Sequence, residues 1–185
     1  MRKILSLVLL SVLSLAVSSR AQENKPPKPA PGPSQAVADS WNDIGRKLIA
    51  MAEDFPEDKY DYKATPAERT FAENLLHVAG VNYYFTNAVR GEKPPAGENP
   101  PRSQYKTKAD VVAFVKKSFA DGASAVESRG DKGINEIVVD PYSSQETRIS
   151  DYAYGFIEHS GEHYGQLVVY YRLNNIVPPG SRPRK

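Results

Sequence analysis

Four segments of this 185-residue chain carry apolar side chains at spacings of three and four residues. In an α-helix this spacing collects the apolar side chains on one side, which must then be buried against other elements. The first segment shows the pattern most clearly, with one stripe formed by Val37, Trp41, Ile44, Leu48 and Met51. Four long amphipathic helices in a single domain predict an all-α fold, a four-helix bundle.

Capping residues and prolines mark where these helices are expected to begin and end. The second helix is expected to open at Thr65-Pro66-Ala67-Glu68, which offers a cap, a first-turn proline and a carboxylate that reaches back to the cap. Thr107, followed by Asp110, is expected to start the third helix. Ser150 is the expected cap of the fourth helix, which we predict to end near Asn174.

The connections between the later helices are long. The segment from Arg129 to Ile149 contains one short apolar run, Ile137 to Val139, that could form a strand. Because no second run of this kind offers a partner, the sequence favours an irregular packed connection. The connection between the second and third helices is also long, so crossover connections are compatible with the pattern.

The N-terminal residues 1–21 have the features of a secretory signal peptide. Two basic residues are followed by the apolar stretch Ile4–Val17, and the small residues Ser19 and Ala21 suit cleavage after Ala21. An uncleaved membrane anchor is the alternative, although a membrane span needs roughly 20 apolar residues and this stretch is shorter. We therefore expect a periplasmic or secreted protein with no membrane association after cleavage.

A spacer and a short tail are expected to flank the helical domain. Residues 22–34 hold five of the fifteen prolines, which favours an extended, disordered spacer. The domain is then expected to span residues 35–179 and to be followed by a basic tail at 180–185. The chain has no cysteine, which excludes disulfides and thiolate ligands.

The charge balance argues against nucleic-acid binding. Of the 24 Lys and Arg residues, three lie in the predicted signal peptide, so 21 basic residues face 22 acidic ones in the remaining chain. A nucleic-acid-binding protein normally carries a clear basic excess or a basic stripe. We therefore expect a small-molecule substrate rather than a nucleic-acid partner.

The chain has only three histidines, His77, His159 and His163. Two of them are four residues apart in the predicted fourth helix, which places both imidazoles on one helix face. The third lies among apolar residues midway along the predicted second helix. Three neutral imidazoles suit a divalent metal such as Zn²⁺, Ni²⁺ or Fe²⁺ and leave one coordination position open. Hydrogen-bonded structural histidines are the alternative interpretation.

Several polar residues lie near these histidines along the predicted helices. Glu73 lies one turn before His77, and Glu158, Glu162 and Gln166 accompany the histidine pair. A carboxylate at such a position could orient an imidazole or accept a proton from metal-activated water, and Gln166 could hydrogen-bond that water. Glu162 and Gln166 are therefore the predicted catalytic residues, although each also suits an ordinary surface position.

The arrangement of the histidines resembles a known family. His77 follows the Thr-Pro start of its helix, and far downstream stands His159-Ser160-Gly161-Glu162-His163-Tyr164-Gly165-Gln166. From about Trp41 to Pro179 the chain resembles the DinB-like (DinB/YfiT) superfamily of metalloenzymes. The Gly165-Gln166 pair matches the family's ending of this motif, whereas Tyr164 stands where many members have Arg.

The resemblance implies a fold and a metal site. In the family, one histidine of the second helix and two histidines of the last long helix bind a divalent metal, which implies that His77, His159 and His163 are the ligands here. It also implies a four-helix bundle that is often dimeric, so a homodimer is expected. Some relatives look like metal-dependent hydrolases, and others are transferases or isomerases that use a low-molecular-weight thiol.

Three functions are therefore compatible with the sequence. The first is an exported metal-dependent hydrolase that uses metal-activated water at the three-histidine site. The second is a thiol-dependent transferase, which the expected export disfavours because such thiols are chiefly cytosolic. The third is a non-catalytic metal-binding or stress-associated helical module.

Overall fold

All four predicted helices are present in the computed structural model, which describes residues 28–183. The α-helices are α1 (Pro33–Asp54), α2 (Phe71–Arg90), α3 (Lys108–Gly133) and α4 (Ile149–Leu173). Single turns of 3₁₀-helix lie at Glu57–Lys59, Arg102–Gln104 and Pro179–Ser181. The predicted signal peptide and residues 22–27 of the predicted spacer lie outside the described residues.

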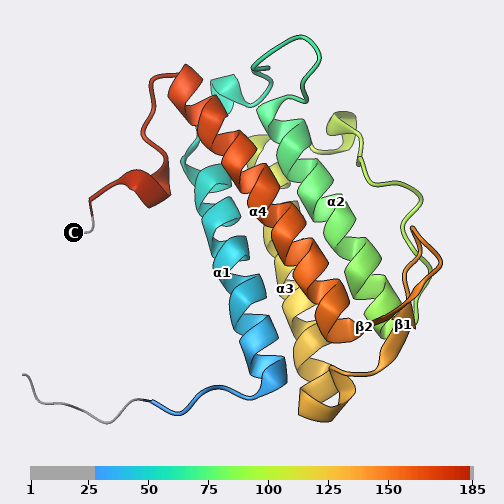
Figure 1. Cartoon of the computed structure of the whole chain (residues 1–185). Coiled ribbons are helices and arrows are strands. Elements are labelled where there is room, and N and C mark those ends of the chain that lie inside the picture. The colour runs from blue at the N-terminus through green and yellow to red at the C-terminus, as the bar shows by residue number, and fades with distance from the viewer. Residues whose placement is uncertain (1–27, 184–185) are drawn as a thin grey trace, which may run out of the picture. The chain divides into compact units, whose positions relative to one another are not determined.

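The helices form a bundle in which α1 lies diagonally opposite α2, and α3 lies diagonally opposite α4. Both α1 and α2 pack mainly against α3 and α4. Figure 1 shows that α1 and α4 run in one direction and that α2 and α3 run in the other. Because α2 and α3 are parallel, the connection 91–107 has to return along the length of the bundle (Figure 1). We call this segment the crossover connection.

The core between the helices is rich in aromatic side chains. Trp41 is 1% exposed, and its ring centroid lies 4.9 Å from that of Phe85 and 5.8 Å from that of Phe119. The indole Nε1 of Trp41 donates a hydrogen bond to the carbonyl oxygen of Phe119 (2.9 Å). Towards the end of α1, Phe55 stacks on Phe71 with a centroid distance of 3.9 Å. These contacts tie α1 to α2 and α3 across the core.

The predicted starts of the second and third helices had different outcomes. Thr107 and Asp110 form a capping box at the start of α3, as predicted. The prediction for α2 was wrong, since the helix begins at Phe71 and its capping box is formed by Thr70 and Glu73. Thr65 lies instead in a preceding turn, where its carbonyl oxygen accepts the backbone N–H of Glu68 (3.1 Å). The helix begins where its buried apolar face begins, at Phe71.

The start of α4 also differs from the prediction. The helix begins at Ile149 with Arg148 at the cap position, and no side chain caps it. The backbone N–H groups of Ile149 and Ser150 donate to the carbonyl oxygens of Glu136 and Ile134 instead. Because the preceding connection satisfies these two N–H groups, the hydroxyl of Ser150 is not needed as a cap.

The connection before α4 is a β-hairpin, and the prediction of an irregular segment was wrong. Strands β1 (Ile137–Val139) and β2 (Glu146–Arg148) pair antiparallel, with Val138 opposite Thr147. The partner strand Glu-Thr-Arg has no apolar run, which is why hydrophobicity did not reveal it. The turn between the strands is closed by the hydrogen bond from Asp140 N to the carbonyl oxygen of Gln145 (2.9 Å).

The ends of the helical domain lie slightly outside the predicted bounds. Helix α1 begins at Pro33, two residues before the predicted start, because Pro33 suits the first helical position. At the other end, Arg182 lies in the predicted basic tail, and its guanidinium donates two hydrogen bonds to the carboxylate of Asp54 (2.7 and 2.6 Å). These bonds lower the pKa of Asp54 and fix the tail against the end of α1.

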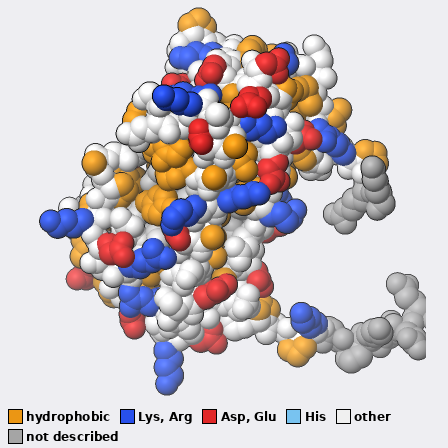
Figure 2. All heavy atoms as spheres, turned by 180° about the vertical axis from the view of Figure 1, so that it is seen from behind, with side chains coloured by type: hydrophobic (Ala, Val, Ile, Leu, Met, Phe, Trp, Pro, Cys, Tyr) orange, Lys and Arg blue, Asp and Glu red, His pale blue; other side chains and the backbone are white. Residues whose placement is uncertain are grey.

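The surface has no strong segregation of charge on the face shown in Figure 2. Lys and Arg side chains are interspersed there with Asp and Glu side chains, and no histidine is visible. None of the helices between residues 28 and 183 combines the length and the hydropathy that a membrane-spanning helix requires.

Candidate metal centre

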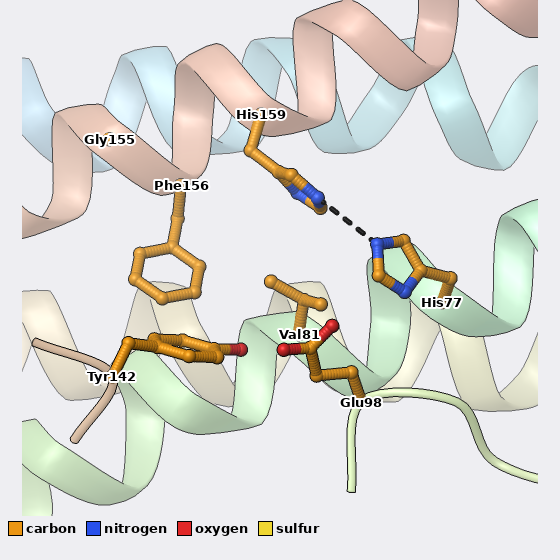
Figure 3. A pocket seen from close by; sticks show the side chains of 7 residues that line it. All are labelled: His77, Val81, Glu98, Tyr142, Gly155, Phe156 and His159. Atoms are coloured by element: carbon orange, nitrogen blue, oxygen red, sulfur yellow. Dashed lines mark hydrogen bonds between the residues drawn. The ribbon is translucent and has the colours of Figure 1, made fainter.

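The three histidines meet between α2 and α4. His77 projects from α2 towards the pair on α4, and Figure 3 shows its imidazole facing that of His159. The Nε2 atom of His159 lies 3.2 Å from Nε2 of His77 and 3.1 Å from Nε2 of His163. All three ligand atoms lie within 4.8 Å of one another. The spacing of four residues thus places both α4 imidazoles on the face that meets His77.

Two asparagines contact the Nδ1 atoms of His163 and His77, whereas Nδ1 of His159 is buried without a hydrogen-bond partner among the described residues. Nδ1 of His163 lies 2.5 Å from Oδ1 of Asn74, and Nδ1 of His77 lies 3.0 Å from Oδ1 of Asn99. The amide nitrogen of Asn74 donates to Oε1 of Gln166 (3.3 Å), which leaves its oxygen to accept from His163. An amide oxygen is an acceptor, so Nδ1 carries the proton in both histidines. Their Nε2 atoms therefore present lone pairs to the centre of the cluster.

This arrangement fits a divalent metal ion. The lone pairs on Nε2 of His77 and His163 both point at Nε2 of His159. In the neutral form this nitrogen carries at most one proton, so it can donate to only one of the two lone pairs. A tetrahedral Zn²⁺ with Zn–N distances of about 2.0–2.1 Å requires ligand nitrogens about 3.3 Å apart. Two of the observed separations, 3.1 and 3.2 Å, are close to that spacing.

The electrostatics keep these imidazoles neutral. His77 and His163 are only 6% and 5% exposed, and burial lowers their pKa values to about 4 and about 3. Burial also lowers the pKa of His159, although the nearby carboxylate of Glu162 opposes this effect. A neutral imidazole is the form that binds a metal ion. The cluster is therefore ready to bind a metal at neutral pH.

The structure places the predicted polar neighbours around the cluster rather than in it. Gln166 is exposed and reaches the site through Asn74. Glu158 and Glu162 are exposed side chains on α4, and their charges act on His159. Glu73 does not orient an imidazole, because its carboxylate accepts the backbone N–H of Thr70 (2.7 Å) in the capping box. The catalytic roles of Glu162 and Gln166 stay predictions.

A pocket of about 250 Å³ opens beside the histidines (Figure 3). It is lined by His77, Val81, Glu98, Tyr142, Gly155, Phe156 and His159. Two of the three clustered imidazoles thus form one wall of the cavity, so a small molecule in the pocket would lie next to the candidate metal position.

The crossover connection supplies two of the residues that sequence reasoning missed, Glu98 and Asn99. A Cβ atom on Gly80 would lie 2.5 Å from the carbonyl oxygen of Glu98, so the glycine in α2 allows the connection to approach closely. This approach brings Asn99 to His77 and Glu98 to the pocket. The third missed residue, Asn74, had a signal in the sequence, because it lies three residues before His77 on the same helix.

The hairpin supplies the fourth missed residue, Tyr142. Its ring stacks on that of Tyr84 in α2 with a centroid distance of 4.4 Å and an interplanar angle of 22°. The carboxylate of Asp140 accepts the backbone N–H of Tyr142 (2.9 Å) and the hydroxyl of Tyr152 in α4 (3.1 Å). Burial and the charge of Glu98 raise the pKa of the Tyr142 hydroxyl. The hairpin turn is therefore held against both helices, and Tyr142 lines one side of the pocket.

Comparison with known proteins gives a family that agrees with this geometry. The family model of the DinB superfamily matches residues 41–167, which is more than half of the chain. The chain belongs to the DinB superfamily. The matched range includes α2, the crossover connection and most of α4, and so contains all three histidines of this DinB-superfamily protein.

Two solved structures from Bacillus subtilis have the same fold. A DinB-like protein, YjoA, matches with a TM-score of 0.63 at 16% identity, covering 81% of this chain and 99% of its own. YfiT, described as a probable metal-dependent hydrolase with an unusual four-helix bundle topology, matches with a TM-score of 0.62 at 14% identity, covering 82% of this chain and 94% of its own. No curated protein matches the chain.

The family and the geometry together support a metal-binding function for this DinB-superfamily protein. The three-histidine cluster predicted from the sequence is present, and its nitrogens converge as metal ligands do. The identity of the divalent metal is not fixed by three imidazoles, because these suit Zn²⁺, Ni²⁺ and Fe²⁺ alike.

Proposed function

We propose that this protein is a metal-dependent hydrolase of a small molecule, with a divalent ion held by His77, His159 and His163. The observation that carries the proposal is the convergence of three Nε2 atoms at the wall of a pocket. Three protein ligands leave a coordination position open, as in catalytic zinc sites. The description of YfiT, which shares the fold, as a probable metal-dependent hydrolase supports the same activity.

The ion would supply Lewis acidity and would lower the pKa of water in the site. The chain's own residues prepare for that chemistry. Asn74 and Asn99 fix the tautomers and orientations of His163 and His77, and Gln166 holds Asn74 in place. Glu162 stays the predicted proton acceptor because it lies on α4 within electrostatic range of His159.

We also propose that the protein is exported and acts as a homodimer. Export rests on the signal-like pattern of residues 1–21, and dimerisation rests on the resemblance to a family with many dimeric members. Secretion of a fusion carrying residues 1–21, and its loss when Arg2 and Lys3 are both changed to Glu, would test export. Sedimentation equilibrium of the mature chain would test dimerisation.

The metal content of the mature protein, purified without a histidine tag, tests the proposed site. We expect near-stoichiometric zinc or nickel in the wild type and none in the His159→Ala/His163→Ala variant. Glu162→Gln is the matched control on the same helix, and it should retain the metal. A wild-type protein that stays metal-free after incubation with divalent ions would contradict the proposal.

Turnover then tests the hydrolase activity. The metal-loaded wild type would be screened against small esters, amides and phosphoesters, with the double histidine variant as the background. We expect hydrolysis that depends on the metal and that falls at least tenfold in kcat for Glu162→Gln. Metal binding without any turnover would identify the protein as a non-catalytic metal-binding module instead.

A further inference from the structure

The pocket beside the histidines has one acidic wall in otherwise apolar and aromatic surroundings. The carboxylate of Glu98 faces the cavity, and the hydroxyl of Tyr142 points towards it (Figure 3). Val81 and the rings of Phe156 and Tyr142 form the apolar part of the lining, and His77, His159 and Gly155 complete it. Glu98 is half-buried, although it lies on a connection rather than on a helix. The side chain therefore contributes a negative charge to a partly desolvated cavity.

No basic side chain of the described residues neutralises that charge. No lysine or arginine lines the pocket, and none of the ion pairs between residues 28 and 183 includes Glu98. Arg69 lies close enough to lower the pKa of all three histidines, but it lines a different cavity together with Lys63 and Arg102. A carboxylate accepts up to about four hydrogen bonds, and the hydroxyl of Tyr142 can supply only one.

We propose that Glu98 binds an ammonium group of the substrate, and that the protein acts on small amines with a short apolar body. This inference rests on the proposed function, because it names the substrate class of that same pocket. A charge-assisted hydrogen bond to Glu98 satisfies the carboxylate, and aromatic rings such as those of Tyr142 and Phe156 attract cations through their faces. At about 250 Å³ the pocket lies below the size of usual drug-binding cavities.

The position of Glu98 also sets the orientation of such a substrate. His77, His159 and Glu98 line the same cavity, as Figure 3 shows. An ammonium group at Glu98 directs the rest of a short molecule towards His77 and His159. Glu98 is therefore a specificity-determining residue, which should distinguish charged ligands from neutral ones. A residue that only stabilised the fold would not make this distinction.

The test compares benzylammonium with its neutral isostere benzyl alcohol on the zinc-loaded full chain. Binding is followed by NMR titration of the backbone amide signals of Val81 and Gly155, which line the pocket. We expect benzylammonium to bind about tenfold more tightly than benzyl alcohol, the usual advantage of a hydrogen bond to a charged group. In Glu98→Gln the two ligands should bind equally.

Glu92→Gln is the matched control, because Glu92 is an exposed carboxylate on the same crossover connection and does not line the pocket. It should retain the full preference for benzylammonium. Equal binding of the two probes by the wild type would overturn the inference, as would a preference that survives in Glu98→Gln. The second result would show that a feature of the pocket other than the Glu98 carboxylate selects the charged ligand.

The zinc content of the same samples separates this inference from the proposed function. A zinc-loaded protein that does not prefer benzylammonium would contradict the substrate class and leave the metal site intact. A protein without zinc that still prefers benzylammonium through Glu98 would support the ammonium site and contradict the metal-dependent activity. Each result therefore bears on one proposal independently of the other.

Discussion

The interface between α1 and α3 and the interface between α2 and α4 both join antiparallel helices, but they are built from different residues (Figure 1). Between α1 and α3, Trp41 packs so closely on Gly122 that a Cβ atom there would lie 2.2 Å from the indole ring. Between α2 and α4, buried polar side chains meet instead, among them Asn74, His77 and His163.

This difference separates stability from chemistry within one bundle. The α1–α3 interface removes a large apolar surface from water, which stabilises the folded state. The α2–α4 interface buries imidazoles, which costs free energy in the absence of an ion because neutral nitrogens face one another. The α1–α3 interface is thus closely packed and apolar around Trp41, whereas the α2–α4 interface holds a polar site beside its buried apolar side chains.

Trp41→Ala should have the largest effect on stability and little effect on the metal site. The substitution leaves a cavity between α1 and α3 and removes the hydrogen bond to Phe119, so the free energy of unfolding should fall by about 4 kcal/mol. Urea unfolding of the metal-free protein measures this loss, and Trp41→Phe should lose much less. If the folded fraction of either variant failed to bind zinc, the two interfaces would not be independent.

Lowering the pH should weaken the α2–α4 interface selectively. In the unfolded chain a histidine has a pKa of about 6.5, whereas burial lowers the pKa values of His77 and His163 to about 4 and about 3 in the folded chain. Below pH 6.5 the unfolded chain therefore binds protons that the folded chain does not. Protonation of these histidines does not oppose folding above pH 6.5, and the stability of the metal-free protein should fall by about 1 kcal/mol per pH unit for each histidine as the pH falls towards 4.

Urea unfolding between pH 7.5 and 5 would measure this dependence. The His159→Ala/His163→Ala variant is the control, because it lacks two of the buried groups and should show a shallower slope. Identical slopes for the variant and the wild type would show that these histidines do not resist protonation in the folded state.

Two asparagines of α2 provide a matched pair for the metal site. Asn74→Ala should weaken metal binding about 10- to 100-fold, because His163 loses the acceptor that fixes its tautomer. Asn82→Ala removes a buried amide from the same helix, where it donates to Ser118 in α3 (3.3 Å), and should lower stability without changing metal affinity. Competition with a chelator would measure the metal affinity of both variants. Equal affinities would rule out a specific role for Asn74.

Thr107→Ala should have the smallest effect. It removes the capping box of α3, so the free energy of unfolding should fall by about 1 kcal/mol. Because α3 contributes none of the clustered histidines, zinc stoichiometry should be unchanged. Thermal unfolding with and without zinc would check both expectations, and a loss of zinc would show that the helix ends of α3 affect the site.

The helices and their buried faces were largely predictable, whereas the starts of α2 and α4 were not. Thr65 and Thr70 are each followed by a glutamate three residues later, so the local pattern alone fits both positions. The structure uses Thr70 because Phe71 stacks on Phe55, and because the N–H of Phe71 donates to the carbonyl oxygen of Tyr62 (3.0 Å). Contacts between separate segments therefore decided between two equivalent caps.

The candidate site, too, was predictable from the sequence only in part. The spacing of His159 and His163 placed them on one helix face, and the scarcity of histidines made His77 the natural third member of the cluster. Nothing in the spacing indicated that Glu98 and Asn99 on a connection would reach this cluster. They reach it because α2 and α3 are parallel, which forces the connection along the bundle and past Gly80.

By itself the sequence determined the four amphipathic helices, the cap of α3 and the pairing of His159 with His163 on one helix face, because each depends on residues within a few positions of one another. Only the tertiary structure decided which helices adjoin, where Asn74 and Asn99 fix the imidazoles, and that Glu98 and Tyr142 line the pocket. These features depend on contacts between distant segments. Local periodicity records which side of a helix is buried, but it does not record which residues bury it.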